Sequence, residues 1–139
     1  MIGLFDSGVG GLYALRELRR LLPHADLVYF ADEANLPYGT RTRPALLRLS
    51  SHALRFLLDK GAGAILIACG TVSSTVYPRL ARECPVPLFD TATPLARSVC
   101  AALAPEKKGR VLLLATEASV KAGAIAREIT APLPDARVL

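Results

Sequence analysis

A cysteine at the end of an apolar strand is the residue of this sequence best suited to chemistry. Cys69 follows the apolar run 64–68, whose isoleucines and leucine are typical of a strand buried on both faces of a parallel sheet. In such sheets, ligands bind outside the carboxyl ends of the strands, so the thiol is predicted to face a crevice. A helix predicted over 72–83 would lower the thiol pKa through its N-terminus. We expect Cys69 to be the most reactive cysteine; the alternative is a small buried side chain that only packs.

Three further groups of residues come directly after predicted strands. Their members are Asp6 and Ser7; Pro37, Tyr38 and Gly39; and Thr116 and Ser119. Because the carboxyl ends of parallel strands meet at one edge of the sheet, these groups are predicted to converge with Cys69 on one site. Taken singly, each has a structural alternative: a turn that starts a helix, a turn in a loop, and a pair of helix-capping residues.

The glycines after Asp6 do not form a dinucleotide-binding fingerprint. With Gly8 and Gly10 as the first two glycines of that motif, the third falls at position 13, which is Tyr13. The turn also has no Lys-Ser or Lys-Thr pair, which a phosphate-binding P-loop requires. What remains is a turn whose backbone N–H groups lie beside a carboxylate and a hydroxyl.

Strands and helices alternate along the chain at short spacing. The predicted strands cover 2–5, 26–30, 64–68, 86–89, 110–115 and 136–139, and the predicted helices cover 12–22, 44–60, 72–83, 94–103 and 116–130. Thr71, Ser73 and Thr75 are candidate caps of the third helix, which tolerates Pro78 only in its first turn. This order predicts a doubly wound α/β fold with a parallel sheet.

We expect two domains in this chain. The first covers 1–92 and contains Cys69, and 93–139 begins a second, similar α/β domain that is incomplete. Since the last predicted strand has nothing after it, the chain is expected to be a fragment or to be completed by another chain.

Composition narrows the class of protein. The 139 residues are 52% hydrophobic and 21% charged, as in a folded soluble domain, and no apolar run is long enough to span a bilayer. Met1 leads into the first strand without a leader peptide, which predicts a cytoplasmic protein with no membrane partner. Three cysteines without a CxxC pair favour neither disulfides nor a metal site. The net charge of +5 favours an anionic substrate, while arginines at helix-face spacing argue against a nucleic-acid partner.

In their order and spacing, four motifs resemble those of the bacterial glutamate racemases over the whole chain. They are the segments 5–11, 37–40, 68–71 and 116–121. The resemblance implies a two-domain α/β enzyme with its site between the domains, which interconverts L- and D-glutamate without a cofactor. It further implies a homo-oligomer that supplies D-glutamate for peptidoglycan, and so for cell-wall biogenesis and cell shape.

The resemblance also implies roles for single residues. Cys69 would be one of two thiol acid/bases, and Asp6 a carboxylate that tunes its proton transfer; two such groups on opposite faces of an α-carbon can invert it. The implied substrate-binding residues are Asp6, Ser7, Pro37, Tyr38, Gly39, Gly70, Thr71, Thr116 and Ser119. The family usually carries Asn where this chain has Gly70, so we expect weaker substrate binding.

The resemblance places the second catalytic cysteine beyond Leu139. Cys84, which precedes a proline, and Cys100, in the middle of a predicted helix, are interpreted as packing residues. The lone chain is therefore expected to be inactive as a racemase. Two alternatives stay open: a non-catalytic remnant that binds glutamate or a similar dicarboxylate, and an interaction protein, since some members of the family bind DNA gyrase.

Overall fold

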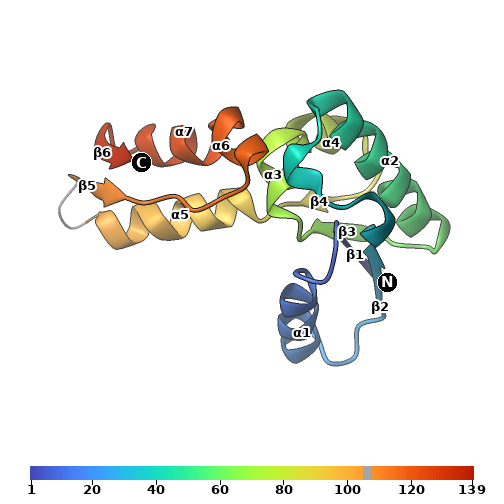
Figure 1. The fold of residues 1–139 in the computed structure, drawn as a ribbon. Helices are drawn as coiled ribbons and strands as arrows, with labels where there is room; N and C mark the ends of the chain where they lie inside the picture. The colour runs from blue at the N-terminus through green and yellow to red at the C-terminus, as the bar shows by residue number, and fades with distance from the viewer. Residues whose placement is uncertain (105–107) are drawn as a thin grey trace.

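The computed structural model describes residues 1–104 and 108–139, and it has a parallel α/β fold (Figure 1). Four strands form one sheet in the order β2-β1-β3-β4, and β5 and β6 form a second sheet; every strand pair is parallel. The strands are β1 Ile2–Asp6, β2 Leu27–Ala31, β3 Ala64–Ile67, β4 Leu88–Phe89, β5 Lys108–Val111 and β6 Asp135–Val138. The predicted parallel α/β class is confirmed.

Helices connect the strands. They are α1 Leu12–Leu21, α2 Arg43–Asp59, α3 Gly70–Thr75, α4 Tyr77–Glu83, α5 Ala92–Leu103, α6 Glu117–Ala122 and α7 Ala124–Thr130, with 3-10 turns η1 Glu33–Asn35 and η2 Tyr38–Thr40. The start of α2 follows from its sequence, because Thr42 Oγ1 accepts the N–H of Ala45 at 3.4 Å and Pro44 lies in the first turn. Its buried stripe packs on the sheet, where Leu57 Cβ would lie only 3.2 Å from a Cβ at Gly3.

Two segments predicted as single helices are each broken in two. The predicted helix over 72–83 is interrupted at Val76, between α3 and α4. In a continuous helix the Pro78 ring would clash with the carbonyl of Ser74, whereas the break places Pro78 in the first turn of α4. The helix predicted to reach residue 130 breaks at Gly123, between α6 and α7, where φ is +64°. Glycine adopts this left-handed conformation readily and commonly ends helices.

The predicted caps of α3 are wrong. Cys69 is the N-cap residue, and its side chain makes no capping hydrogen bond. The hydroxyls of Ser73 and Thr75 bind carbonyl groups instead, those of Ile67 and Thr71 respectively.

Three strands are shorter than predicted, and β3 loses only residue 68. The strand predicted over 110–115 is observed at Lys108–Val111, and beyond its end the N–H of Leu113 still donates to the carbonyl of Leu139 at 2.9 Å. The strand predicted over 86–89 begins only at residue 88, because Pro87 has no N–H to donate to a sheet.

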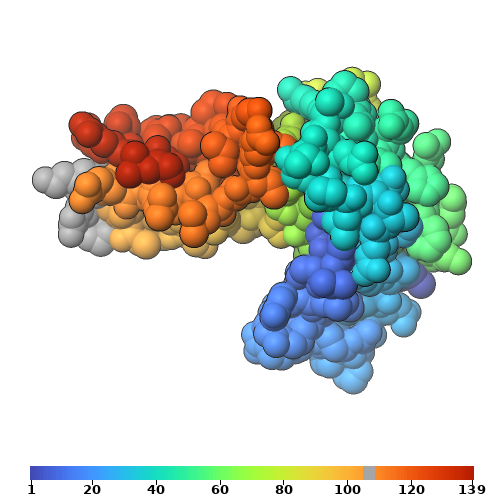
Figure 2. Space-filling view, viewed as in Figure 1, coloured from blue at the N-terminus to red at the C-terminus, as the bar shows by residue number. Residues whose placement is uncertain are grey.

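Buried apolar side chains form two separate clusters. The larger one lies between α2 and the four-stranded sheet and includes Phe5, Leu57, Ile65 and Ile67. The smaller one joins α5, α7 and β6 through Ala96, Ile125, Ile129 and Ala136. Figure 2 shows the C-terminal part, in orange and red, as a lobe that extends from the N-terminal part. We call the part with the larger cluster, up to β4, the N-terminal lobe, and the part with the smaller cluster, from α5 onward, the C-terminal lobe. That these lobes are domains divided at residue 92 stays a prediction.

A search of the helices in residues 1–104 and 108–139 finds none that is long and apolar enough to cross a membrane.

Candidate functional site

β1 and β3 are neighbours in the sheet and bring Ser7 and Cys69 together at their carboxyl ends. The register pairs Phe5 with Ile67, and the N–H of Ala68 donates to the carbonyl of Phe5 at 2.8 Å. Just beyond this pairing, the Cys69 thiol donates a hydrogen bond to Ser7 Oγ, with 3.4 Å between sulfur and oxygen. The thiol thus lies at the strand edge predicted for it, but the prediction that it faces an open crevice is wrong, because Cys69 belongs to the larger buried cluster.

Burial dominates the ionisation of the Cys69 thiol. The side chain is only 3% exposed, and desolvation raises its pKa above the ordinary value of a cysteine. Hydrogen bonds with Ser7 and with the N–H of Val72 act in the opposite direction, and the negative charge of Asp6 raises the pKa further. The predicted lowering of this pKa by the helix N-terminus is therefore wrong, because desolvation outweighs the donors at the start of α3.

The Asp6 carboxylate holds the turn between β1 and α1. Its Oδ2 accepts the N–H of Gly11 at 2.9 Å and the N–H of Gly8 at 3.3 Å. The carbonyl of Gly8 in turn accepts the Tyr29 hydroxyl at 2.6 Å, and burial raises the pKa of Tyr29 to about 12. Among the hydrogen bonds of the described residues there is none between Asp6 and Cys69. Asp6 therefore acts on the thiol through its charge, and its direct contacts support the structural interpretation of this turn.

Tyr38 is turned into the protein interior. It is 2% exposed, its ring packs edge-on against Phe5, and its hydroxyl donates to Asp32 Oδ2 at 2.6 Å. Desolvation, followed by the bond to Asp32, raises the pKa of the phenol. Asn35 also donates to the Asp32 carboxylate, at 2.8 Å. Sequence analysis missed this buried Asp32, which no motif signals, while Pro37 beside Tyr38 is exposed.

Gly39 places the turn η2 directly against the start of α6. A Cβ at position 39 would lie 2.8 Å from Thr116 Cβ, closer than two non-bonded carbons can approach. Glycine is therefore required here for close approach of the two lobes.

A chain of hydroxyl groups joins α3 to α6. Thr71 Oγ1 lies 3.0 Å from Thr116 Oγ1, Thr116 Oγ1 lies 2.9 Å from Ser119 Oγ, and Ser74 Oγ donates to Ser119 Oγ at 2.8 Å. Thr116 is also the N-cap of α6, where its Oγ1 accepts the N–H of Ser119 at 3.4 Å. The capping interpretation of Thr116 is confirmed, and the same hydroxyl links the two lobes. Ser74 was missed; the run of hydroxyl residues 73–75 in so short a helix was its only signal.

Two of the predicted groups meet at α3, the residues around Cys69 and the hydroxyl residues of the chain that leads to α6. Asp6, Ser7 and Cys69 lie at its start, and Thr71, two residues after Cys69, begins the hydroxyl chain. Gly70 lies between them, exposed, and a Cβ there would have no atom within 4 Å.

The other two thiols lie elsewhere. Cys84 ends α4, and Cys100 lies in α5 with its sulfur 3.7 Å from the carbonyl of Ile129. Their interpretation as packing residues agrees with this placement. Within residues 1–104 and 108–139, no group of three or more His, Cys, Asp and Glu side chains could hold a metal ion.

Comparison with known proteins gives a consistent answer. No protein-family model matches the chain. It is 44% identical over 128 residues to the glutamate racemase of Thermus thermophilus, covering 92% of this chain and 48% of the relative. It is 39% identical over 123 residues to the glutamate racemase of Aquifex aeolicus, covering 88% of this chain and 47% of the relative. The chain therefore spans about half the length of the curated relatives it matches.

Solved structures agree with the sequences. The crystal structure of the Thermus thermophilus glutamate racemase in complex with β-chloro-D-alanine matches with a TM-score of 0.83 and 40% identity, covering 99% of this chain and 50% of that one. The Aquifex pyrophilus glutamate racemase matches with a TM-score of 0.86 and 35% identity, covering 99% and 53% respectively. In sequence and in fold, the chain is a relative of the glutamate racemases that corresponds to about half of their length.

Proposed function

We propose that this chain supplies one half of a glutamate racemase site, in which Cys69 serves one face of the substrate's α-carbon, and that the whole enzyme makes D-glutamate for peptidoglycan without a cofactor. The supporting observation is the Cys69–Ser7 pair at the carboxyl edge of β1 and β3, in a chain 44% identical to a glutamate racemase. Related glutamate racemases have been solved in complex with D-glutamate and with L-glutamate, which supports glutamate as the substrate.

Racemisation breaks one bond from the α-carbon to hydrogen and forms another on the opposite face. As a base, the Cys69 thiolate takes the α-proton, which forms the S–H bond and leaves the electron pair on carbon. A second acid then donates a proton to the other face. We place that acid outside these 139 residues, because Cys84 and Cys100 lie away from Cys69 in the described structure. In the reverse direction, the Cys69 thiol is the proton donor.

The raised pKa of Cys69 suits the donor role, because desolvation of the buried sulfur favours its protonated form. Its role as a base requires a partner that favours the thiolate, and the positively charged ammonium group of bound glutamate is one. Asp6 opposes ionisation of the thiol through its charge. In this proposal, the balance between these two charges sets the proton affinity of the sulfur.

The α-carbanion needs hydrogen-bond donors fixed around the substrate carboxylate. Thr116 is suited to this because it is exposed, and the buried Thr71 hydroxyl lies 3.0 Å from that of Thr116. Ser74 and Ser119 hold this pair in place through the hydroxyl chain.

The proposal is tested by following L-glutamate in a polarimeter. The chain of 139 residues alone should not interconvert the enantiomers. Interconversion should appear when a segment with a second cysteine is added, in the same polypeptide or as a separate chain. In that complete enzyme, Cys69→Ala should abolish turnover, and the matched Cys84→Ala should retain it. Turnover by the chain alone, or by the Cys69→Ala enzyme, contradicts the proposal.

A glutamate-binding protein without turnover is the second candidate. It is favoured by Gly70, which leaves open space where the family usually carries Asn. Saturable glutamate binding by the complete protein, with no exchange of the α-proton, would support this candidate over the racemase.

A further inference from the structure

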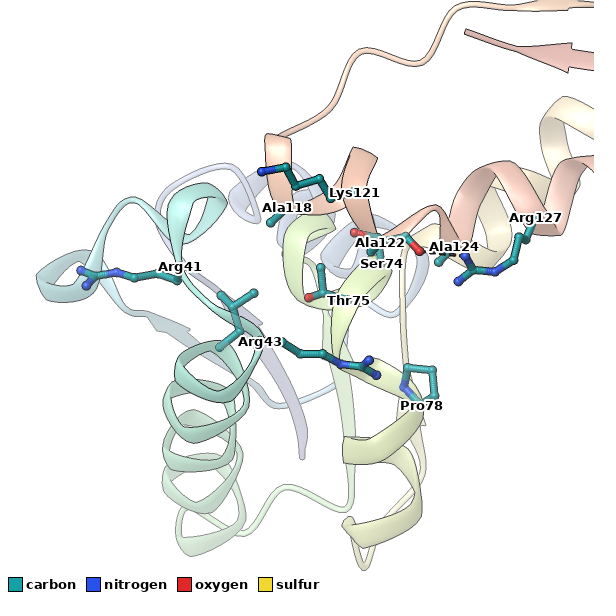
Figure 3. Close-up of a pocket in the computed structure, with 11 residues that line it drawn as sticks. Arg41, Arg43, Ser74, Thr75, Pro78, Ala118, Lys121, Ala122, Ala124 and Arg127 are labelled. Carbon is teal, nitrogen blue, oxygen red and sulfur yellow. Dashed lines mark hydrogen bonds between the residues drawn. The ribbon is translucent and has the colours of Figure 1, made fainter.

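A cavity of about 340 Å³ lies beside α3 and is lined by residues of both lobes (Figure 3). Cys69 does not line it. The lining includes the hydroxyl residues Ser74 and Thr75 and four cationic side chains, and no acidic side chain lines it. The cationic residues are Arg41, Arg43, Lys121 and Arg127. This volume is in the range of small-molecule sites, and its charge favours an anion.

Two of the four cations are already engaged by the protein. Lys121 forms an ion pair with Glu117 of its own helix, and Arg41 Nη2 donates to the carbonyl of Asn35 at 3.0 Å. Both side chains add positive potential to the cavity, but each already has a partner within the protein.

Arg43 and Arg127 keep free donors. Within residues 1–104 and 108–139, the Arg43 guanidinium makes no hydrogen bond or ion pair, and Arg127 uses Nη1 for the carbonyl of Ala122 at 2.8 Å. Figure 3 shows both side chains extending to the side of α3 on which Pro78 lies. Guanidinium groups bind phosphate through paired N–H donors.

The N-terminus of α2 adds to this positive end of the cavity. Arg43 is the first residue of that 17-residue helix, whose N-cap is Thr42. The partial positive charge of a long helix at its N-terminus favours bound anions, and phosphate in particular.

We propose that this cavity binds a phosphate group between Arg43 and Arg127, either as orthophosphate or as the phosphate of a small monoester. Two guanidinium groups and a helix N-terminus match the double negative charge of phosphate better than the single charge of a carboxylate. Because Arg43 lies in the N-terminal lobe and Arg127 in the C-terminal lobe, the bound group bridges the two. The site is separate from Cys69, so it does not depend on the proposed racemase chemistry.

Calorimetric titration tests this at constant ionic strength, with inorganic phosphate, glucose 6-phosphate and glucose as probes. We expect saturable binding of inorganic phosphate, about tenfold weaker in both Arg43→Gln and Arg127→Gln. The exposed Arg48→Gln on the same helix makes the same change of charge outside the cavity and should bind like the parent. Arg43→Lys, which keeps the charge without the paired donors, should weaken binding by an intermediate factor.

The probes separate the two sources of the phosphate group. Tighter binding of glucose 6-phosphate than of inorganic phosphate, with the same dependence on both arginines, assigns the site to phosphate esters; equal or weaker binding assigns it to orthophosphate. A heat signal that does not saturate, or equal binding by the parent, Arg43→Gln and Arg127→Gln, overturns the proposal. Circular dichroism of each variant confirms that it is folded.

Discussion

Replacing Gly39 with alanine should destabilise the contact between the lobes. The new Cβ would lie 2.8 Å from Thr116 Cβ and 2.9 Å from Thr116 Cγ2. Neither atom is the end of a flexible side chain: Cβ is bonded to the backbone, and Cγ2 moves only if the capping hydroxyl of Thr116 also moves. Gly39 is not one of the positive-φ glycines of the described chain, so the effect comes from the contact and not from backbone strain.

The size of the effect follows from what must move. Either the turn η2 or the start of α6 has to retreat, and a retreat of α6 stretches the 3.0 Å hydrogen bond between Thr71 and Thr116. Overpacking of this kind costs about 1–3 kcal/mol, and a lost hydrogen bond about 0.5–1.5 kcal/mol. Since α6 can yield in part, we expect a loss of about 1–3 kcal/mol in the free energy of unfolding. At this chain length, that is roughly 3 °C in Tm for each kcal/mol.

Urea unfolding followed by circular dichroism measures this loss. Gly70→Ala is the matched control, because a Cβ at position 70 meets no atom within 4 Å, and it should be as stable as the parent or slightly more stable. The Gly39→Ala penalty should largely disappear when Thr116→Gly removes both clashing carbons. A loss of less than about 0.5 kcal/mol in Gly39→Ala, or an equal loss in the Thr116→Gly background, would refute the close approach of η2 and α6.

Three further predictions concern the site. At neutral pH, iodoacetamide should label Cys69 more slowly than Cys84 and Cys100, because burial shields the sulfur and raises its pKa; this reverses the expectation from sequence. Labelling of Cys69, read by peptide mass spectrometry, should accelerate above the ordinary thiol pKa of about 8.5. Fastest labelling of Cys69 at neutral pH contradicts this prediction. Gly70→Asn should tighten glutamate binding about tenfold in a complete enzyme, since a hydrogen bond to a charged group is worth about 1.5–3 kcal/mol. Unchanged affinity in calorimetry means that the Asn side chain makes no contact with glutamate. Folding raises the pKa values of Cys69 and Tyr29, the latter to about 12. The stability linked to these two groups is therefore complete below their unfolded pKa values and is lost as the pH rises through their folded pKa values. Tm should fall above about pH 9, and it should fall less steeply in Cys69→Ala.

Local patterns were sufficient to predict the order of the elements. Apolar runs such as 64–67 are short, rich in isoleucine and leucine, and bounded by glycine, and they became strands of a parallel sheet. Pro78 and Gly123 were visible in the sequence as residues that interrupt helices. Their effect was underestimated, because the apolar spacing on both sides of each residue continues as in one helix.

The site was less predictable, because its properties depend on tertiary contacts. That strand ends would bring Ser7 and Cys69 together followed from topology alone. The raised pKa of Cys69 did not follow from topology, since this pKa depends on how completely other side chains cover the sulfur. Asp32 and Ser74 were missed for a similar reason: each is defined by a partner far along the chain or by burial, and no motif marks it.

Exchange of the α-proton of glutamate in D₂O tests the role of Cys69 most directly. The 139-residue chain is incubated separately with L- and D-glutamate, and the α-proton signal is followed by NMR while polarimetry follows handedness. With one acid/base on one face, the account predicts loss of the α-proton signal from one enantiomer only, without inversion, and no loss in Cys69→Ala. Exchange of both enantiomers, inversion by the chain alone, or exchange that persists in Cys69→Ala would contradict it.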